Sequence, residues 1–478
     1  MSKEIYDVVI GLEVHAQLLT STKIFCGCST DTGLEPNTNT CPVCMGMPGV
    51  LPVLNKRVVD CGIKLGHATN CRITEDNIFA RKNYFYPDLP KGYQITQFDE
   101  PICTDGYIDI DGKGHAKRIR INRIHMEEDA GKNIHDVDAP YSYVDYNRAG
   151  VPLLEIVTEP DISSTDEAVA YLKDLRQLMQ YLNICDGNME QGSLRCDANV
   201  SVMKKGAEVY GTRTELKNMN SFRNVQKALE FEIERHIGLI ESGGHVVQET
   251  RLWNASSNQT FAMRSKEESH DYRYFPEPDL VPIVIDESWI AEIVQKLPEL
   301  PREKRQRFMQ QYSLPSYDAD VLTQTTGLAD YFEQCAGLYD RPKEISNWIM
   351  TEVLRAVKDE QTGLKDFKVT PGMLAGMLVL IRKGTISGKM AKDIFEEMLS
   401  TGKGPEEIVK DKGLAQISGE EELKDVVACV LEEHPAEVNK YRQGKTQVMG
   451  FLVGQVMKAT KGRANPKLLN EIVKEMLS

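Results

Sequence analysis

Strict alternation of apolar and polar residues is the feature that most limits how this chain can fold. From Ile10 to Leu18 every second side chain is apolar, and the pattern returns from Leu194 to Val202. The polar positions between them are Glu13, His15 and Gln17 in the first run, Arg195, Asp197, Asn199 and Ser201 in the second, and Arg213, Glu215 and Lys217 in a shorter third run. Period 2 with one apolar face is typical of antiparallel strands covered on one side. We therefore predict a sheet-rich body over residues 1–293.

Helical spacing interrupts this pattern twice and then replaces it. Thr165–Tyr181, with Thr165 as its predicted N-cap, and Phe222–Ile240 carry apolar residues three and four apart. A charged, proline-punctuated stretch follows residue 294 and indicates a domain boundary. Beyond it we predict helices over 343–357, 371–383, 388–399, 420–432, 445–459 and 466–477. The predicted fold class is α+β: an antiparallel-sheet body (1–293), a helical domain (294–405) and a small helical tail domain (406–478).

Charge and cysteine usage narrow the functional classes. The 478 residues carry a net charge of −14, which argues against coating nucleic acid non-specifically. Residues 441–478 nevertheless hold seven basic and two acidic residues, a local charge of +5 (7 − 2). No run of about 18 apolar residues is present, and acids interrupt the N-terminus, so we expect neither a membrane span nor a signal peptide. Eleven cysteines without a secretory signal favour the reducing cytosol, and we predict a cytoplasmic protein.

Four of the cysteines have the spacing of a metal site. Cys26-x-Cys28 is followed, after twelve residues, by Cys41-x-x-Cys44. Two short-spaced pairs on separate turns can place four thiolates around a tetrahedral zinc ion. Metal-free thiols and a redox pair remain as alternatives. Because four protein ligands leave no open position, the predicted zinc site is structural.

Acidic residues near a histidine suggest a second kind of site. Glu13 and His15 lie two apart on a strand, so both side chains project from one face, where they can bind a divalent cation or simply face water. Glu128 ends a strand-like run in a group of three acids, and Glu155 lies in an otherwise apolar run. A carboxylate in such a run must be exposed, paired or coordinated. Carboxylates with interspersed arginine and lysine suit Mg²⁺ and a polyphosphate, which favours phosphoryl transfer.

Eight long segments, in order along the chain, resemble one family. They are VIGLEVHAQL (9–18), NTNTCPVCMGMPGVLPVLN (37–55), RKNYFYPDLPKGYQITQ (81–97), RIHMEEDAGK (123–132), DYNRAGVPLLEIVTEPD (145–161), GSLRCDANVSV (192–202), TELKNMNSF (214–222) and DYRYFPEPDL (271–280). The family is the B subunit of the aspartyl/glutamyl-tRNA(Asn/Gln) amidotransferase, and residues 449–473 resemble its tail. No large insertion lies between 214 and 300, so the shorter bacterial or organellar type is favoured.

The resemblance implies an ATP-dependent ligase that forms carbon–nitrogen bonds. In this family, the B subunit works in a heterotrimer with two others: an amidase (glutaminase), which is the A subunit, plus a small C subunit. With ATP and Mg²⁺ it phosphorylates the side-chain carboxylate of glutamate or aspartate mischarged on tRNA(Gln) or tRNA(Asn). Ammonia from the amidase then displaces phosphate. A carboxylate is a poor acyl donor, and its conversion to an acyl phosphate supplies a good leaving group. The protein's task is then mainly positioning and charge neutralisation.

The resemblance also implies residue roles. Glu13, His15 and Glu128 would bind Mg²⁺ and act in catalysis, with Glu155 as a further candidate. The nucleotide or substrate pocket would include Lys82, Arg195, Asp197, Asn199, Glu215 and Lys217, for which surface or structural ion pairing is the alternative. Cys26, Cys28, Cys41 and Cys44 match the zinc-bearing members of the family. Lys458, Lys461 and Arg463 would contact tRNA phosphates, with an ordinary solvated face as the alternative.

Two other classes remain open. A non-catalytic, zinc-containing tRNA-binding scaffold would tolerate Glu13→Ala or Glu128→Ala. A metal-dependent hydrolase unrelated to tRNA would turn over without it.

Overall fold

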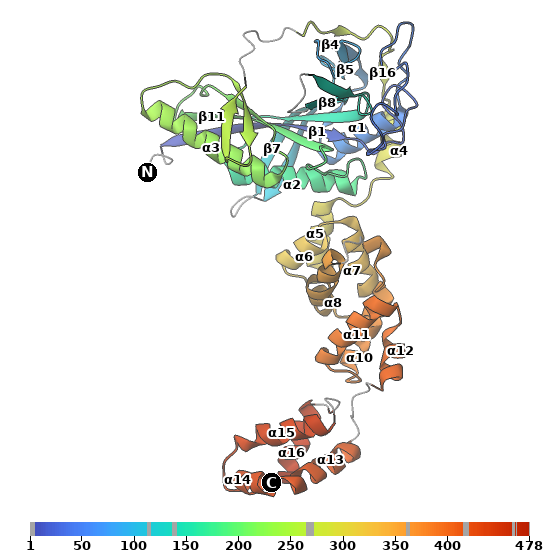
Figure 1. Ribbon diagram of the computed structural model, residues 1–478, viewed down its shortest axis with the longest axis vertical. Helices are drawn as coiled ribbons and strands as arrows, with labels where there is room; N and C mark the ends of the chain where they lie inside the picture. Colours follow the sequence, from blue (N-terminus) through green and yellow to red (C-terminus); the bar gives the residue numbers. More distant parts are fainter. Residues whose placement is uncertain are drawn as a thin grey trace. The chain divides into compact units, whose positions relative to one another are not determined.

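The chain forms two compact units, Met1–Pro301 and Arg302–Ser478. The computed structural model describes residues 5–111, 116–135, 141–263, 272–359, 364–413, 420–460, 464 and 466–477. Figure 1 shows a sheet-rich part followed along the chain by helices alone, so the predicted α+β class is confirmed. None of the helices in the described ranges is both long and apolar enough to cross a membrane.

A nine-stranded sheet dominates the first unit, with strand order β14-β13-β12-β11-β1-β10-β7-β6-β2. Its neighbouring strands pair antiparallel, except β12 and β13, which are parallel. The strands are β1 (Tyr6–Gln17), β2 (Arg72–Ile73), β6 (Cys103–Asp111), β7 (Ala116–Glu128), β10 (Pro152–Thr158), β11 (Leu194–Lys204), β12 (Thr214–Lys217), β13 (Thr250–Asn254) and β14 (Gln259–Ala262).

Helices cover one face of this sheet. Ile10, Leu12 and Val14 of β1 are almost fully buried, as the alternation predicts, and belong to one continuous core. Figure 1 shows α2 (Thr165–Tyr181) and α3 (Phe222–Glu241) against the sheet, with α1 (Lys56–Ala68) and α4 (Glu287–Val294) near its other end. Because the helices cover the apolar face, the opposite face is left for polar side chains.

The cap of α2 differs from the prediction. The N-cap is Ser164, whose side chain accepts a hydrogen bond from the backbone N–H of Glu167, and Thr165 is the first helical residue. Serine and threonine are both good caps, and the residue with extended backbone takes the role. Ser221 caps α3 in the same way.

Shorter strands lie beside the main sheet. β15, β4 and β5 form a three-stranded sheet, β16 pairs with β3, and β8 with β9. Their bounds are β3 (Asp76–Asn77), β4 (Phe79–Asn83), β5 (Tyr93–Gln97), β8 (Lys132–His135), β9 (Ser142–Asp145), β15 (Phe275–Pro276) and β16 (Ile283–Val284). β5 packs next to β7: Thr96 donates a hydrogen bond to the Glu127 carboxylate over 3.1 Å. This contact brings Lys82 and its neighbours near the polar face.

The second unit is helical and contains two separate apolar clusters. One spans Phe308–Val409 and the other Leu423–Leu477. The helix predicted over 343–357 is α8, a π-helical turn at Ile349–Val353, and α9. The helices are α5 (Pro301–Gln311), α6 (Ser316–Leu322), α7 (Thr326–Leu338), α8 (Pro342–Trp348), α9 (Leu354–Asp359), α10 (Pro371–Arg382), α11 (Gly388–Thr401), α12 (Pro405–Lys412), α13 (Glu420–Glu433), α14 (Pro435–Arg442), α15 (Val448–Ala459) and α16 (Pro466–Leu477).

Candidate functional site

Strand register brings polar side chains together on the open face of the sheet. His15 of β1 lies opposite Arg195 on one side and Glu155 on the other. Glu13 lies opposite Asp197. Directly opposed residues of neighbouring strands project from the same face. We call this surface the polar floor, and its members are Glu13, His15, Glu127, Glu155, Arg195, Asp197 and Lys217.

Three residues of the polar floor can hold a metal ion. One ligand atom from each of Glu13, His15 and Glu155 lies within 4.8 Å of the others. His15 Nε2 is 3.4 Å from Glu155 Oε2 and 3.7 Å from both Glu13 Oε1 and Glu127 Oε1. Two carboxylates and an imidazole converging on one point are a donor set that suits a divalent cation. The residue predicted as a further candidate, Glu155, is thus part of the cluster.

The electrostatics of this cluster are those of a cation site. Burial alone would lower the pKa of His15, but its hydrogen bond to Glu155 and the surrounding carboxylates raise it to about 9. Burial would raise the pKa of Glu155, but His15 lowers it to about 2. Burial, and then the charge of Glu155, raise the pKa of Glu127 to about 7 and that of Glu13 above its usual value. The carboxylates therefore crowd negative charge, which a proton on His15 relieves and which a bound cation would relieve in its place.

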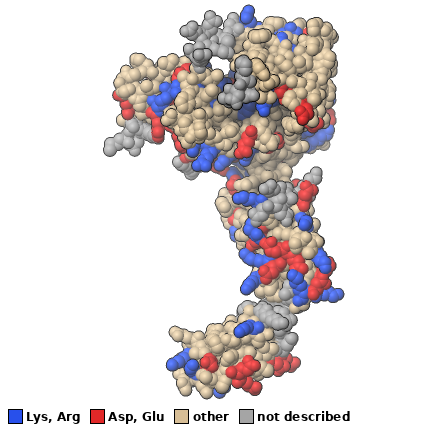
Figure 2. All heavy atoms as spheres, viewed as in Figure 1, with Lys and Arg blue, Asp and Glu red and all other residues tan. Residues whose placement is uncertain are grey.

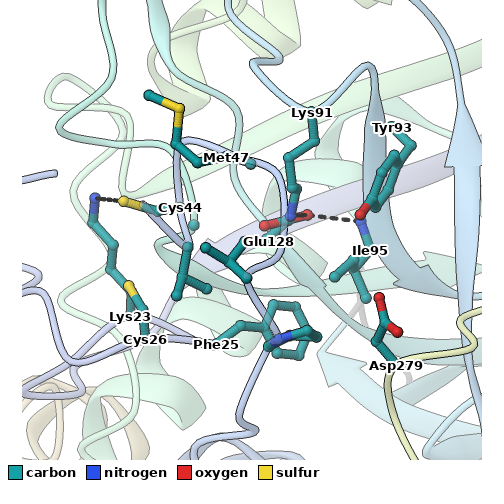
Figure 3. Close-up of a pocket in the computed structure, with 15 residues that line it drawn as sticks. Lys23, Phe25, Cys26, Cys44, Met47, Lys91, Tyr93, Ile95, Glu128 and Asp279 are labelled. Atoms are coloured by element: carbon teal, nitrogen blue, oxygen red, sulfur yellow. Dashed lines mark hydrogen bonds and ion pairs between the residues drawn. The ribbon is translucent and has the colours of Figure 1, made fainter. Parts of the chain in front are cut away.

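The side chain of Glu128 does not join this cluster. It accepts a hydrogen bond from the backbone N–H of Ile95 over 2.8 Å and pairs with Lys91. Figure 3 shows Glu128 pointing toward Lys91 in a cavity of about 90 Å³ whose lining also includes Cys26 and Cys44. In this structure the Glu128 side chain therefore lies apart from Glu13 and His15.

Strand geometry explains this placement of Glu128. Successive side chains of a strand point to opposite faces, so Glu127 and Glu128 cannot share one. Ile124 and Met126 are fully buried, and Glu128, two residues further on, faces the same side as they do. Glu127 is the residue that reaches the polar floor. The apolar character of Ile124 and Met126 was the sequence signal that could have identified it.

Charged pairs surround the cluster. Lys217 Nζ lies 2.6 Å from Asp197 and 3.0 Å from Glu215, whose charges hold the pKa of this lysine high despite burial. Arg195 lies 3.1 Å from Asp129, a buried carboxylate that the sequence identified only as one of three successive acids. Asp129 also accepts a hydrogen bond from Gln17 over 2.8 Å.

Lys82 enters from the small sheet. Burial would lower its pKa, but Glu127 and neighbouring groups raise it. Its ammonium nitrogen lies 4.8 Å from the centre of the Tyr272 ring and 5.9 Å from that of Tyr84. Asn199, predicted for the pocket, lies opposite Glu215 on the same face.

Most of the predicted pocket residues line one hollow of about 310 Å³. Its lining includes Glu13, His15, Lys82, Glu155, Arg195, Asp197 and Lys217, together with Glu127 and Asp129. Lysine and arginine therefore border a carboxylate–imidazole cluster inside a single concavity. Such a hollow can accept a cation and a polyanion together.

The four predicted zinc ligands also converge. One sulfur from each of Cys26, Cys28, Cys41 and Cys44 lies within 4.8 Å of the others. A hydrogen bond from the Cys26 thiol lowers the pKa of Cys44 to about 4. Four sulfurs at this spacing, one of them readily ionised, fit the donor set of a structural zinc site.

The predicted tRNA contacts are only partly described. Lys458 is exposed near the C-terminal end of α15, whereas Lys461 and Arg463 lie outside the described residues. Figure 2 shows acidic side chains mixed with basic ones over the helices of the second unit in this view. Phosphate contact there would depend on a local basic patch.

Two family models cover most of the chain. The one described as GatB/GatE catalytic domain matches residues 8–291, and the one described as GatB domain matches residues 330–477. The chain belongs to the GatB family. The B subunit of the aspartyl/glutamyl-tRNA(Asn/Gln) amidotransferase of Geotalea uraniireducens is 59% identical over 477 residues, and that of Thermodesulfovibrio yellowstonii is 56% identical over 472. Each alignment covers 99% of both chains, so the resemblance seen in the sequence motifs is confirmed along the whole length.

Proposed function

We propose that this chain is the carboxylate-activating subunit of a tRNA-dependent amidotransferase. The observation that carries the proposal is the Glu13–His15–Glu155 cluster, which shares one hollow with lysine and arginine side chains. Its acyl substrate is glutamate or aspartate esterified to tRNA(Gln) or tRNA(Asn), as the names of its GatB relatives suggest, and its phosphoryl donor is ATP. The overall reaction is a carbon–nitrogen ligation with glutamine as amido donor.

The polar floor suits the activation step. Glu13, His15 and Glu155 would hold Mg²⁺, which would neutralise charge on the nucleotide phosphates. Lys217 and Lys82 border the same hollow and would donate hydrogen bonds to phosphate oxygens. The substrate carboxylate attacks the γ-phosphorus and ADP leaves. Ammonia then attacks the acyl phosphate carbon, phosphate leaves, and a nearby base accepts the surplus proton.

Partner subunits would supply the ammonia for the reaction. The relatives are named as the B subunit of an amidotransferase, which fits an enzyme of several chains. We infer a heterotrimer with two partners: an amidase (glutaminase), the A subunit, which releases ammonia, plus a small C subunit. The helical residues from 294 onward would hold the tRNA, with residues 406–478 as its tail domain. We place the complex in the cytoplasm, where its tRNA substrates are.

The cysteine cluster would bind zinc for stability. Its four sulfurs lie on turns near residues 26–28 and 41–44. These turns lack extensive secondary structure of their own, so a tetrahedral ion would fix them against the body. Four protein ligands would leave this zinc no place in the reaction.

The decisive experiment measures transamidation by the assembled complex with Glu-tRNA(Gln), ATP and Mg²⁺. We expect Glu155→Gln to abolish both tRNA-dependent ADP formation and amide formation. Glu159→Gln is the matched control, because Glu159 lies just beyond the same strand and contacts Asn122 rather than the cluster. Full activity of Glu155→Gln would instead support a scaffold role. ATP turnover that needs no tRNA would support an unrelated hydrolase.

A further inference from the structure

A lysine is completely buried beside the cysteine cluster. Lys23 is 0% exposed, and its ammonium nitrogen lies 3.8 Å from Cys44 Sγ and donates a hydrogen bond to the Asn39 carbonyl oxygen over 2.9 Å. Figure 3 shows the lysine side chain extending toward Cys44. Taking an ammonium group out of water is costly unless a negative charge lies close to it. A lysine buried in this way therefore needs a partner of opposite charge.

No carboxylate of the described residues neutralises Lys23. The structure offers a direct comparison, because Lys304 is the other lysine that is buried among the described residues. The ammonium nitrogen of Lys304 lies 3.3 Å from Asp330 and 3.5 Å from Glu333. In the same described ranges, no carboxylate oxygen lies within 4.0 Å of the Lys23 ammonium nitrogen. The group that can carry the opposite charge is the sulfur of Cys44.

The backbone fixes Lys23 in this position. Its N–H donates a hydrogen bond to the Cys28 carbonyl oxygen over 2.9 Å, so the chain on either side of Cys26 folds back on itself. Gly150, whose φ is +84°, lies against the lysine stem, and a Cβ at this position would be 3.5 Å from Lys23 Cδ and from Cys44 Cβ. The lysine stem and Cys44 therefore pack side by side, which directs the ammonium group toward the sulfurs.

A zinc ion bound by four thiolates needs a nearby cation of this kind. Four thiolates around one Zn²⁺ leave a surplus of two negative charges, which is costly in buried surroundings. N–H groups that bond to the ligand atoms disperse this charge and orient the ligands. Cys44 Sγ receives two such groups, the ammonium group of Lys23 and the backbone N–H of Cys41 over 3.2 Å. Of these two donors, the lysine is the one with a full positive charge.

We propose that Lys23 is the charge-compensating residue of the zinc site, an inference that rests on the zinc assignment in the proposed function. Lys23 is a positioning residue, since it would act on the metal through Cys44 and would not touch the ion. The thiolates that bind zinc would also supply the negative charge that the buried lysine requires. Lys23 lines the cavity that contains Glu128, but that carboxylate already pairs with Lys91. The charge of Lys23 is therefore assigned to the sulfur side.

The test measures the zinc affinity of the full chain by competition with a chelator of known affinity. Lys23→Met keeps an unbranched stem without the charge, and we expect it to weaken zinc binding about tenfold or more, as the loss of an outer-shell partner does. Lys23→Gln is a second neutral variant that carries an uncharged amide donor, and it should lose as much affinity. Lys23→Arg keeps the positive charge and should retain most of the affinity.

Thermal unfolding with and without zinc separates charge from packing. Lys23→Met should lower the melting temperature more in the zinc-loaded protein than in the metal-free protein, because the metal-free cluster carries fewer thiolate charges for the lysine to balance. A lysine that served only to fill space would lower both melting temperatures equally. That result would overturn the proposal.

Lys91→Met is the matched control. Lys91 lines the same cavity as Lys23, but its ammonium group pairs with Glu128 and not with a ligand sulfur, so zinc affinity should match that of the wild type. The proposal is overturned if Lys23→Gln binds zinc as tightly as the wild type, if Lys23→Arg loses as much affinity as Lys23→Met, or if Lys91→Met weakens zinc binding equally. A wild-type chain that binds no zinc would instead refute the zinc assignment itself.

Discussion

Replacing Glu232 with glutamine should destabilise the first unit strongly. The Glu232 carboxylate is fully buried and accepts hydrogen bonds from Thr260, Arg235 and His236, with Arg251 3.6 Å away. Burial would raise its pKa, but these partners lower it from 4.5 to about 2. Lowering the pKa of Glu232 from 4.5 to about 2, at roughly 1.4 kcal/mol per pH unit, predicts a contribution of roughly 3.5 kcal/mol to folding at neutral pH.

The pH dependence has a definite sign. The folded-state pKa is depressed, so this stability is fully present above the unfolded pKa near 4.5 and is lost as pH falls toward 2. Glutamine carries no charge at any pH. The difference between wild type and Glu232→Gln should therefore be largest at neutral pH and shrink as pH falls below about 4.5.

Urea unfolding of the full chain, followed by tryptophan fluorescence, measures the effect, because Trp253 lies buried in the neighbouring strand β13. Glu230→Gln is the matched control: Glu230 is exposed on the same helix and contacts only Gln226 among the contacts described. A change below about 0.5 kcal/mol for Glu232→Gln, or a difference that grows on acidification, would refute the reasoning.

Three further outcomes are expected. Purified wild-type protein should carry one zinc ion per chain by elemental analysis. The double variant Cys41→Ser, Cys44→Ser should lose the zinc and unfold at a lower temperature, because four thiolates are needed to close the site. A metal-free wild-type protein would contradict this. Glu128→Gln should leave Mg²⁺ affinity close to wild type by titration, because Glu128 faces away from the polar floor, and a loss as large as that of Glu155→Gln would count against the site. Deletion of residues 408–478 should weaken tRNA binding and flatten its salt dependence, and Lys458→Ala should do so to a smaller extent. Filter binding at several salt concentrations measures both effects. An unchanged slope of affinity against salt concentration would show that the tail does not contact the tRNA.

The alternation of polar and apolar residues predicted much of the polar floor. It placed Glu13 and His15 on one face of β1, and Asp197 on one face of β11. Both strands have a buried apolar side, so one face could only be polar. The spacing of the four cysteines predicted their cluster in the same way, from residues close together in the sequence. Each of these predictions depended on residues within a single strand or turn.

Features that depend on pairing between distant segments could not be predicted. The sequence does not state that β1 lies between β10 and β11, a register that places Glu155 beside His15. Asp129 lies just after a strand end, where period 2 no longer defines a face, and its contact with Arg195 crosses the sheet. The resemblance alone carried the assignment of Glu128, and a shared motif does not say which face of β7 each of its acids occupies. Glu127 was missed for that reason.

The adjacency of Glu127 and Glu128 has a mechanical consequence. One carboxylate contacts His15 in the hollow, and the other pairs with Lys91 in the cavity behind the strand. A single peptide unit joins the two residues, so β7 separates their surroundings at this point, as β5 does through Gln94 and Ile95. Glu128 is held by the backbone N–H of Ile95 as well as by Lys91, and Glu127 accepts a hydrogen bond from Thr96. Neighbouring residues of β5 therefore fix both carboxylates, one on each side of β7.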